Sequence, residues 1–346
     1  MKRQHASARP APAGAGPFSY PAAQGKAMSR AMVPHRERRH LLGLEGMSRE
    51  EILAILDDAE RCRARLRAGG TPFDDLRGVT VLLAFFEDST RTRVSFELAA
   101  RHLGATVATL TTAGSSISKG ESLFDTVQNI GAMGVDLVVV RHWASGAPAF
   151  LARQLDVGVI NAGDGRHEHP TQGLLDLMTL RDAWKDRFEG RRLALVGDVA
   201  HSRVARSAIF GLTALGASVT VAGPATLIPA GIERLGCAVA PTVEEAMEGA
   251  DAVMALRLQK ERMDGGLLPS LGEFSKVWGL TVERVRLLAR DAVVLHPGPM
   301  NRGVEVMPEV ADGERSVILD QVENGVALRC AVLKRCAEAA RAKETV

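Results

Sequence analysis

The sequence predicts an α/β protein with two doubly wound parallel-sheet domains, joined by interdomain helices and with an active site in the cleft. Short, almost wholly apolar runs such as 79–86 indicate strands buried on both faces, which is typical of parallel sheets. These runs alternate with helical patterns, as βαβ units require. The alternation occurs twice, before and after a polar stretch at Asp182–Gly190, and 346 residues are enough for two domains.

These patterns divide the chain into four parts. Residues 1–39 are a tail, 40–182 and 183–318 are the two α/β domains, and 319–346 form a C-terminal helix long enough to pack back on the first domain.

The tail is basic and is expected to be disordered. It contains five of the fifteen prolines and no periodic apolar pattern. A basic, acid-poor leader can be an organelle transit peptide. A solvated tail or a start site placed too early are the other interpretations, since Met28 and Met32 also precede the body.

Charge and composition exclude several functions. Residues 1–40 hold eight of the 43 Lys/Arg and one of the 41 acids, so this end is net +7 and the remainder net −5. The body therefore has no basic footprint for nucleic acid, and aromatic residues make up only 4%. No apolar run is long enough to span a membrane. Four cysteines without a Cys-x-x-Cys pair indicate unlinked thiols in a reducing, cytoplasmic compartment.

The first half of the body begins with a capped helix. Ser48 and Glu51 form a capping box, and Ile52, Leu53 and Leu56 supply the inner face of that helix. Strands are then predicted at 79–86, 106–110, 136–140 and 157–161, with helices over 94–103, from 122 onward and around 174–180.

The stretch Ser89–Arg93 joins the strand at 79–86 to the helix at 94–103. The apolar residues of this helix are expected to pair four apart, Val94 with Leu98 and Phe96 with Ala100, with Leu103 continuing that face. Hydroxyls, free N–H groups at a helix start and arginines together indicate an anion site, and phosphate suits the arginine fork. The alternative is an ordinary helix cap with solvated arginines.

The second half repeats the pattern. Strands are predicted at 192–198, 218–223, 251–256 and 292–295. The last helix runs from about Leu319 to Lys343. Its expected buried stripe consists of Val322, Val326, Cys330, Leu333 and Ala337.

Two other kinds of site are disfavoured. His167 and His169 flank Glu168, but no further set of metal ligands accompanies them. The segment after the strand at 192–198 lacks the glycine fingerprint of dinucleotide binding, with only Gly197 present.

The turn at His296–Pro299 follows the last strand. Prolines around a glycine fix the backbone, so its carbonyls can face a ligand; the alternative is a rigid turn. The polar loop at 111–122, with Lys119 among hydroxyls, is by itself typical of a mobile surface loop.

Three motifs together carry a family resemblance. Ser89-Thr90-Arg91-Thr92-Arg93, His169-Pro170-Thr171-Gln172 and His296-Pro297-Gly298-Pro299 occur in the order found in carbamoyltransferases. From about residue 40 to 340 the chain resembles the aspartate carbamoyltransferase catalytic subunits of this superfamily. Ornithine enzymes typically carry His-Cys-Leu-Pro and Asp-x-x-Asn-Asn segments, whereas this chain has the turn above and Asp198–Arg203.

The resemblance implies a reaction and a set of substrate contacts. The carbamoyl group of carbamoyl phosphate would pass to the amine of L-aspartate, giving N-carbamoyl-L-aspartate and phosphate for pyrimidine biosynthesis. The implied phosphate contacts are Ser89, Thr90, Arg91 and Thr92. Those around the carbonyl oxygen are Arg141, His169 and Thr92, and those of the carbamoyl NH2 are Gln172 with Pro297, Gly298 and the adjoining Pro299.

Aspartate is implied to bind at cationic residues. Arg203 would hold the α-carboxylate, Arg257 and Gln259 the side-chain carboxylate, and Lys119 would reach both substrates. The loop serine is Ser115 by spacing, with Ser116 as the alternative. Family members often have a larger residue in place of Gly298, and we expect a backbone contact to tolerate that change.

The resemblance also implies partners. It implies a homotrimer whose sites are shared between subunits through Lys119, with regulatory chains or a dihydroorotase as further partners, and no metal or organic cofactor. The alternatives are a carbamoyltransferase for another amino acid, such as ornithine, and a non-catalytic scaffold relative. The complete set of basic residues argues against the scaffold.

Overall fold

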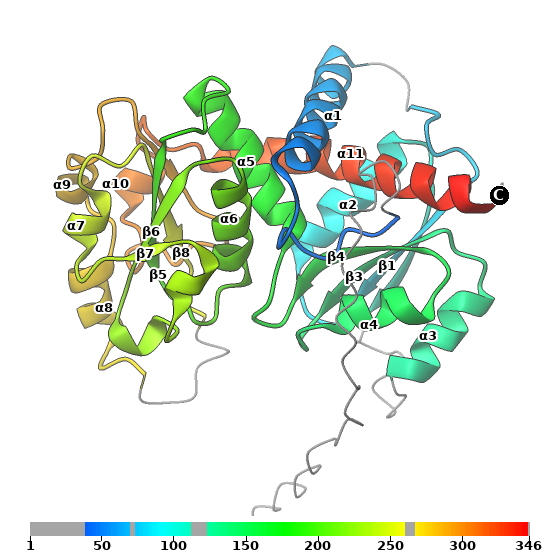
Figure 1. Cartoon of the computed structure of the whole chain (residues 1–346), viewed down its shortest axis with the longest axis horizontal. Coiled ribbons are helices and arrows are strands. Elements are labelled where there is room, and N and C mark those ends of the chain that lie inside the picture. Colours follow the sequence, from blue (N-terminus) through cyan, green and yellow to red (C-terminus); the bar gives the residue numbers. More distant parts are fainter. Residues whose placement is uncertain (1–38, 70–72, 112–122, 260–266, 345–346) are drawn as a thin grey trace, which may run out of the picture. The chain divides into compact units, whose positions relative to one another are not determined.

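The computed structural model describes residues 39–69, 73–111, 123–259 and 267–344, all of which lie in one compact unit. It confirms an α/β fold with two parallel sheets (Figure 1). None of the helices in these ranges is both long and apolar enough to cross a membrane.

The first sheet has four strands in the order β2-β1-β3-β4, all parallel. The strands are β1 (Thr80–Phe85), β2 (Thr106–Thr111), β3 (Leu137–His142) and β4 (Gly158–Asp164). The helices of this half are α1 (Arg49–Ala68), α2 (Thr90–His102), α3 (Leu123–Ala132), α4 (Ala147–Gln154) and α5 (Pro170–Trp184). The predicted capping box of Ser48 and Glu51 starts α1.

The second sheet has five parallel strands in the order β7-β6-β5-β8-β9. The strands are β5 (Arg192–Gly197), β6 (Ser218–Ala222), β7 (Ala238–Val239), β8 (Ala252–Leu256) and β9 (Val293–Leu295). The α-helices of this half are α6 (Arg203–Ala214), α7 (Val243–Met247), α8 (Leu271–Trp278), α9 (Val282–Val285) and α10 (Pro308–Ala311), with 3-10 turns at Ala225–Leu227 and Ile232–Leu235.

The last helix, α11 (Ile318–Glu344), packs against α1, α2 and α5 and also contacts β9 (Figure 1). Of its predicted buried stripe, Cys330, Leu333 and Ala337 are buried, but Val322 is 56% exposed. This part of the prediction was wrong because the N-terminal turn of α11 borders an open cavity.

The apolar residues of α2 differ in their exposure to solvent. Val94 and Leu98 on α2 are 42% and 43% exposed, whereas the opposite side of the helix, with Phe96 and Ala100, is buried.

The predicted domain boundary at 182 falls in the last turn of α5. This boundary and the other proposed domain boundaries remain predictions.

A short segment from Arg39 to Glu45 runs along β4. Arg39 forms an ion pair with Asp156 before the strand begins, and Leu41 exchanges backbone hydrogen bonds with the strand. Glu45 then donates its backbone N–H to Glu168 beyond the strand's end. The segment therefore connects the amino edge of this sheet to its carboxyl edge.

Candidate active site

A cavity of about 650 Å³ lies where the carboxyl edges of the two sheets meet. Strand order reverses between β1 and β3 in one sheet and between β5 and β8 in the other. Such switch points open crevices that bind ligands. The predicted residues that line this cavity are Ser89, Thr90, Arg91, Thr92, Arg141, His169, Gln172, Arg203, Arg257, Gln259, Pro297, Gly298 and Pro299.

The predicted anion loop lies at the end of β1 and the start of α2. Ser89 occupies the N-cap position, but among the described residues its side chain makes no capping hydrogen bond. The interpretation of this stretch as an ordinary helix cap therefore lacks the side-chain hydrogen bond that defines such a cap. Arg91 donates weakly to the Pro297 carbonyl at 3.4 Å, and burial together with the charge of Arg257 lowers its pKa. The guanidinium is held among other cations, which suits it to an anion.

An arginine of strand β3 and an arginine of helix α6 meet the same carboxylate. Arg141 in β3 lies with Nε 3.5 Å from Glu87 Oε2, and Arg203 at the start of α6 donates to that oxygen at 2.7 Å. Gly163 in β4 makes room for both. A Cβ atom there would lie 2.9 Å from Arg203 Nε and 3.1 Å from Arg141 Nη1.

His169 precedes α5 and is held by its backbone. Its N–H donates to the Ser207 hydroxyl at 2.9 Å, and that hydroxyl donates to Glu168 at 2.9 Å. Burial, followed by the charges of Arg141 and Arg203, lowers the pKa of His169 well below its usual range. The imidazole is therefore neutral near pH 7 and carries one N–H for donation.

Arg257 and Gln259 follow β8. Their side chains lie within hydrogen-bond range, with Arg257 donating to Gln259 at 3.4 Å. The Gln259 backbone N–H donates to Asp198 at 3.2 Å, and Asp198 also accepts from His201 at 2.8 Å. Asp198 thus ties the loop after β8 to the loop that precedes Arg203.

The turn after β9 is fixed by a buried histidine. His296 Nδ1 accepts the Gly298 N–H at 2.8 Å, and Nε2 lies 3.2 Å from Glu305. Gly298 has φ 62°, and a Cβ atom there would lie 2.1 Å from Arg91 Nη1. A larger residue would have to adopt this positive φ and displace the flexible end of Arg91, so the expected tolerance at Gly298 stays a prediction.

Ser115, Ser116 and Lys119 lie outside the described residues. Sequence reasoning also missed several residues of the cavity, including Glu87, Gln321 and Arg329. Glu87 directly follows the apolar strand run, and this position was the available signal. Gln321 and Arg329 lie within the pattern of a long helix and gave none.

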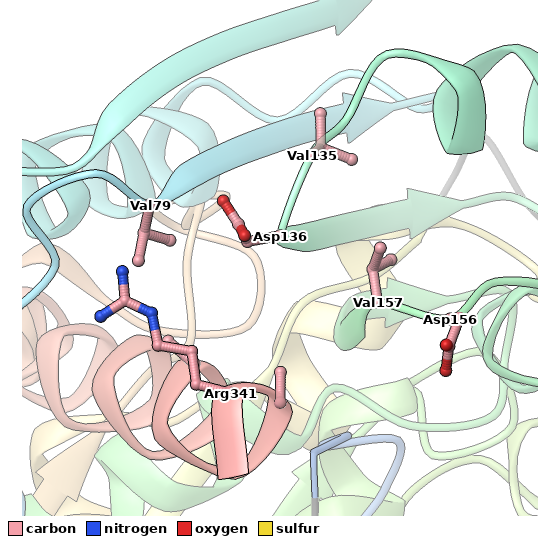
Figure 2. Close-up of a pocket in the computed structure, with 8 residues that line it drawn as sticks. Val79, Val135, Asp136, Asp156, Val157 and Arg341 are labelled. Carbon is pink, nitrogen blue, oxygen red and sulfur yellow. The ribbon is translucent and has the colours of Figure 1, made fainter. Parts of the chain in front are cut away.

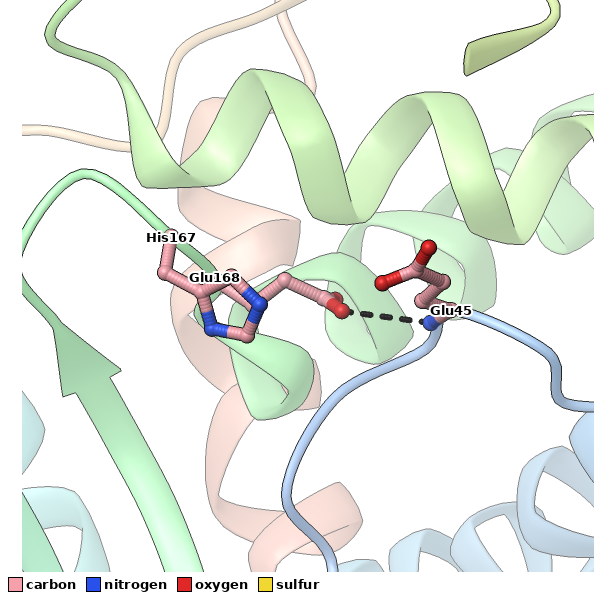
Figure 3. Close-up of side chains that lie close together, drawn as sticks. All are labelled: Glu45, His167 and Glu168. Atoms are coloured by element: carbon pink, nitrogen blue, oxygen red, sulfur yellow. Dashed lines mark hydrogen bonds between the residues drawn. The ribbon is translucent and has the colours of Figure 1, made fainter. Parts of the chain in front are cut away.

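Glu45, His167 and Glu168 place donor atoms within 4.8 Å of one another, as a metal ion would require (Figure 3). The Glu168 carboxylate, however, accepts hydrogen bonds from the N–H groups of Glu45 and the preceding residue and from the Ser207 hydroxyl. These contacts satisfy a buried carboxylate without a metal. The arrangement favours a structural anchor for the loop before α5.

A smaller hollow lies at the opposite edge of the first sheet (Figure 2). It has a volume of about 40 Å³ and is lined by residues that precede β1, β3 and β4 and by the end of α11, including Asp136 and Arg341. This volume suits about one water molecule. The larger cavity is therefore the candidate active site.

Two family models match the chain. The carbamoyl-P binding domain of aspartate/ornithine carbamoyltransferase matches residues 39–182, and the Asp/Orn binding domain of the same enzymes matches residues 189–336. The chain belongs to the aspartate/ornithine carbamoyltransferase family. This confirms the family expected from the three motifs.

Relatives within the family are of the aspartate type. The aspartate carbamoyltransferase catalytic subunits of Pelotomaculum thermopropionicum and Sorangium cellulosum are 54% and 55% identical. The matches cover 85% and 88% of this chain, and 95% and 94% of those proteins.

Solved structures agree in fold. Aspartate transcarbamoylase from Trypanosoma cruzi, in complex with carbamoyl aspartate and phosphate, has a TM-score of 0.78 at 29% identity, covering 88% of this chain and 97% of that one. Ornithine carbamoyltransferase from Thermus thermophilus has a TM-score of 0.76 at 30% identity, covering 86% of this chain and 98% of that one. The fold is thus shared by both types of enzyme, whereas the two sequence relatives named above are aspartate carbamoyltransferase catalytic subunits.

Proposed function

We propose that this chain transfers the carbamoyl group of carbamoyl phosphate to the amine of L-aspartate, giving N-carbamoyl-L-aspartate and phosphate. The observation that carries the proposal is that one cavity collects the anion loop of one sheet and two arginines, Arg203 and Arg257, of the other. One anionic substrate and a second with two carboxylates need such a division of charge. The curated relatives support aspartate over ornithine.

The phosphate end of carbamoyl phosphate is assigned to Ser89, Thr90, Arg91 and Thr92. The start of α2 offers free backbone N–H groups and the positive end of the helix dipole. Arg91 adds two parallel donors.

The carbamoyl carbon is the reacting atom. The aspartate amine attacks it, the carbon–oxygen bond to phosphate breaks, and the leaving phosphate takes the amine proton. Negative charge grows on the carbonyl oxygen, where Arg141, neutral His169 and Thr92 are assigned as donors. Such a donor contributes roughly 3–4 kcal/mol to the transition state.

The remaining contacts orient the two substrates. Gln172 and the carbonyls of the turn Pro297–Pro299 are assigned to the carbamoyl NH2. Arg203 is assigned to the α-carboxylate of aspartate, and Arg257 with Gln259 to its side chain. Holding both substrates in line supplies much of the rate.

The test compares acceptors. Purified protein is assayed with carbamoyl phosphate and either aspartate or ornithine, and carbamoyl product is measured. We expect product with aspartate only. Product with ornithine only would identify the alternative carbamoyltransferase, and no product with any amino acid would favour the scaffold.

We further propose a homotrimer in which Ser115 and Lys119 enter the neighbouring site. Val94 and Leu98, exposed on α2, support a contact with a second copy. Mixing Arg91→Ala chains with Lys119→Ala chains should restore part of the activity, because some mixed sites lack both changes. Verified mixed trimers that stay inactive would contradict shared sites.

Location and further partners complete the proposal. The four cysteines are unlinked and buried, which supports a reducing compartment such as the cytoplasm. Regulatory chains and a dihydroorotase remain predicted partners. A native mass measurement of the purified assembly tests for both.

A further inference from the structure

A buried carboxylate lies directly behind the cavity. Asp176 is on α5, one helical turn beyond Gln172, and is 2% exposed. Its Oδ1 atom accepts Nε2 of Gln172 at 2.9 Å and Nε2 of Gln321 at 2.7 Å. Its Oδ2 atom has no hydrogen-bond partner among the described residues.

This contact fixes the orientation of two amide groups. A carboxylate oxygen that accepts both contacts requires each glutamine to present its NH2 group. The oxygen of each planar amide then points away from Asp176. Gln321 Oε1 accepts the His296 backbone N–H at 2.9 Å, and Gln172, which lines the cavity, is left with its oxygen toward the ligand.

The orientation does not depend on the protonation of Asp176. Burial raises the pKa of this carboxyl to about 7, against the opposing effects of the two glutamines and Arg329. A proton would bind to Oδ2, because Oδ1 already accepts two N–H groups. Oδ1 therefore remains the acceptor on both sides of neutral pH.

A second acceptor is oriented through the same group. The Gly298 N–H points to His296 Nδ1, so the Pro297 carbonyl, at the other end of a planar trans peptide, points the opposite way. Arg91 reaches that carbonyl oxygen from the cavity side. The His296 backbone is in turn held by Gln321, and Gln321 by Asp176.

We propose that Asp176 is a positioning residue that makes the site selective for a carbamoyl NH2 over an isosteric methyl group. It does so by holding the Gln172 oxygen, and through Gln321 the Pro297 carbonyl, as acceptors facing the ligand. The inference rests on the proposed function. It specifies carbamoyl phosphate, rather than acetyl phosphate, as the donor substrate. A methyl group in place of NH2 leaves the Gln172 oxygen unpaired and leaves the Pro297 carbonyl with no donor beyond Arg91.

The test measures two ligands on Asp176→Leu, a change that keeps the shape and removes the acceptor. We expect kcat/KM for carbamoyl phosphate at saturating aspartate to fall about tenfold, the effect of one lost hydrogen bond. The inhibition constant of acetyl phosphate should change less than twofold. Asp176→Asn, which keeps an acceptor oxygen, should stay within about threefold of the wild type.

Thr179→Val is the matched control. Thr179 lies further along α5 and accepts a hydrogen bond from Asn324 of α11 at 3.0 Å, so its loss weakens the same pair of helices away from the cavity. We expect a lower melting temperature and an unchanged ratio of the two constants. An equal weakening of both ligands in Asp176→Leu, or a changed ratio in Thr179→Val, would overturn the proposal.

A second variant keeps the test decisive if Asp176→Leu does not fold. Gln172→Met removes the oriented oxygen and should weaken carbamoyl phosphate without weakening acetyl phosphate. Asp176→Asn added to it should again change kcat/KM by no more than about threefold, because the asparagine keeps an acceptor oxygen for Gln321. Failure of the wild type to carbamoylate aspartate would sink the proposed function, whereas an active wild type with unchanged selectivity in the variants sinks this inference only.

Discussion

Gly163 shapes the candidate site through the side chain that it lacks. It has φ 114° within β4, a conformation that L side chains rarely adopt, and Arg141 and Arg203 occupy the space where its Cβ atom would lie. These arginines come from β3 and from the start of α6, and they reach the same carboxylate, Glu87. The position of both guanidinium groups therefore depends on one glycine.

We predict that Gly163→Ala lowers kcat/KM about 100-fold, because displacing two positioned arginines by about 1 Å misaligns both substrates. Steady-state kinetics with each substrate varied checks this. Gly134→Ala is the control, because Gly134 also has positive φ but no described atom lies within 4 Å of its Cβ position. Equal losses in the two variants would attribute the effect to backbone strain.

His169 should make the protein sensitive to acid. Its pKa is lowered by burial and by neighbouring arginines, so the unfolded chain takes up a proton near pH 6.5 while the native imidazole does not. The free energy of unfolding therefore falls as the pH drops below 6.5. His169→Asn should flatten this dependence between pH 6.5 and 5, measured by urea unfolding at several pH values.

Thr179→Val, which removes no titratable group, provides the control and should leave the slope as in the wild type. A wild-type slope in His169→Asn would show that the imidazole is protonated in the native state.

A single site residue can be predicted from the sequence when its chemistry suits a position at a strand end or a helix start. Arg91 and His169 were predictable for this reason. Glu87 was not predictable. An acidic residue beside an anion site is explained only by the arginines that contact it, Arg141 of β3 and Arg203 of α6. Asp176 lies within an apolar helix, where a single acid reads as solvent-facing, and it is buried only because α11 packs on α5.

Among the helices, α1, α5 and α11 are joined by one arginine. Arg63 of α1 is buried, donates to Asn324 of α11 at 2.9 Å and forms a bidentate ion pair with Asp182 of α5. Side-chain hydrogen bonding to Asp182 raises the pKa of Arg63 despite its burial. A charge held in this way secures the packing behind the cavity without touching it.

We predict that Arg63→Met lowers the free energy of unfolding by about 2 kcal/mol, because it leaves the buried amide oxygen of Asn324 without its donor. Its kcat/KM should match the wild type. Chemical denaturation measures the first and a standard assay the second. Arg67→Met, which breaks an exposed ion pair with Glu323 on the same pair of helices, should give no measurable change.

The principal strands and long helices were predictable because their apolar runs are continuous or periodic. The short helices α4, α7, α9 and α10 were not, since four to eight residues carry too little periodicity. The exposure of Val94, Leu98 and Val322 was also beyond a pattern argument. Their helices are amphipathic over a wide face, and only packing decides which part of it is covered.

Five arginines line the large cavity of the molecule. Outside the basic tail the chain is net negative, yet Arg91, Arg141, Arg203, Arg257 and Arg329 line one cavity. Charge of one sign in a concave site attracts oppositely charged ligands and speeds their association. Both substrates of the proposed reaction are anions, so this distribution suits their capture.

The segment from Arg39 to Glu45 sets how far the chain can be shortened from its N-terminus. Removing residues 1–38 should leave activity and melting temperature unchanged, because it keeps every contact with β4 that the structure describes for this segment, starting with that of Arg39. Removing residues 1–45 should abolish activity, because Glu168 loses two backbone donors beside His169. A series of truncations, assayed for activity and melting temperature, checks both, and a gradual decline would contradict the prediction.

Cutting the segment from Arg39 to Glu45 would affect the active site, although the cut itself lies outside the cavity. A cut before Arg39 would leave every described contact of this segment in place, whereas a cut between Arg39 and Glu45 would loosen the loop that carries His169. We therefore expect N-terminal processing or a fusion partner to be compatible with catalysis on the outer side of Arg39.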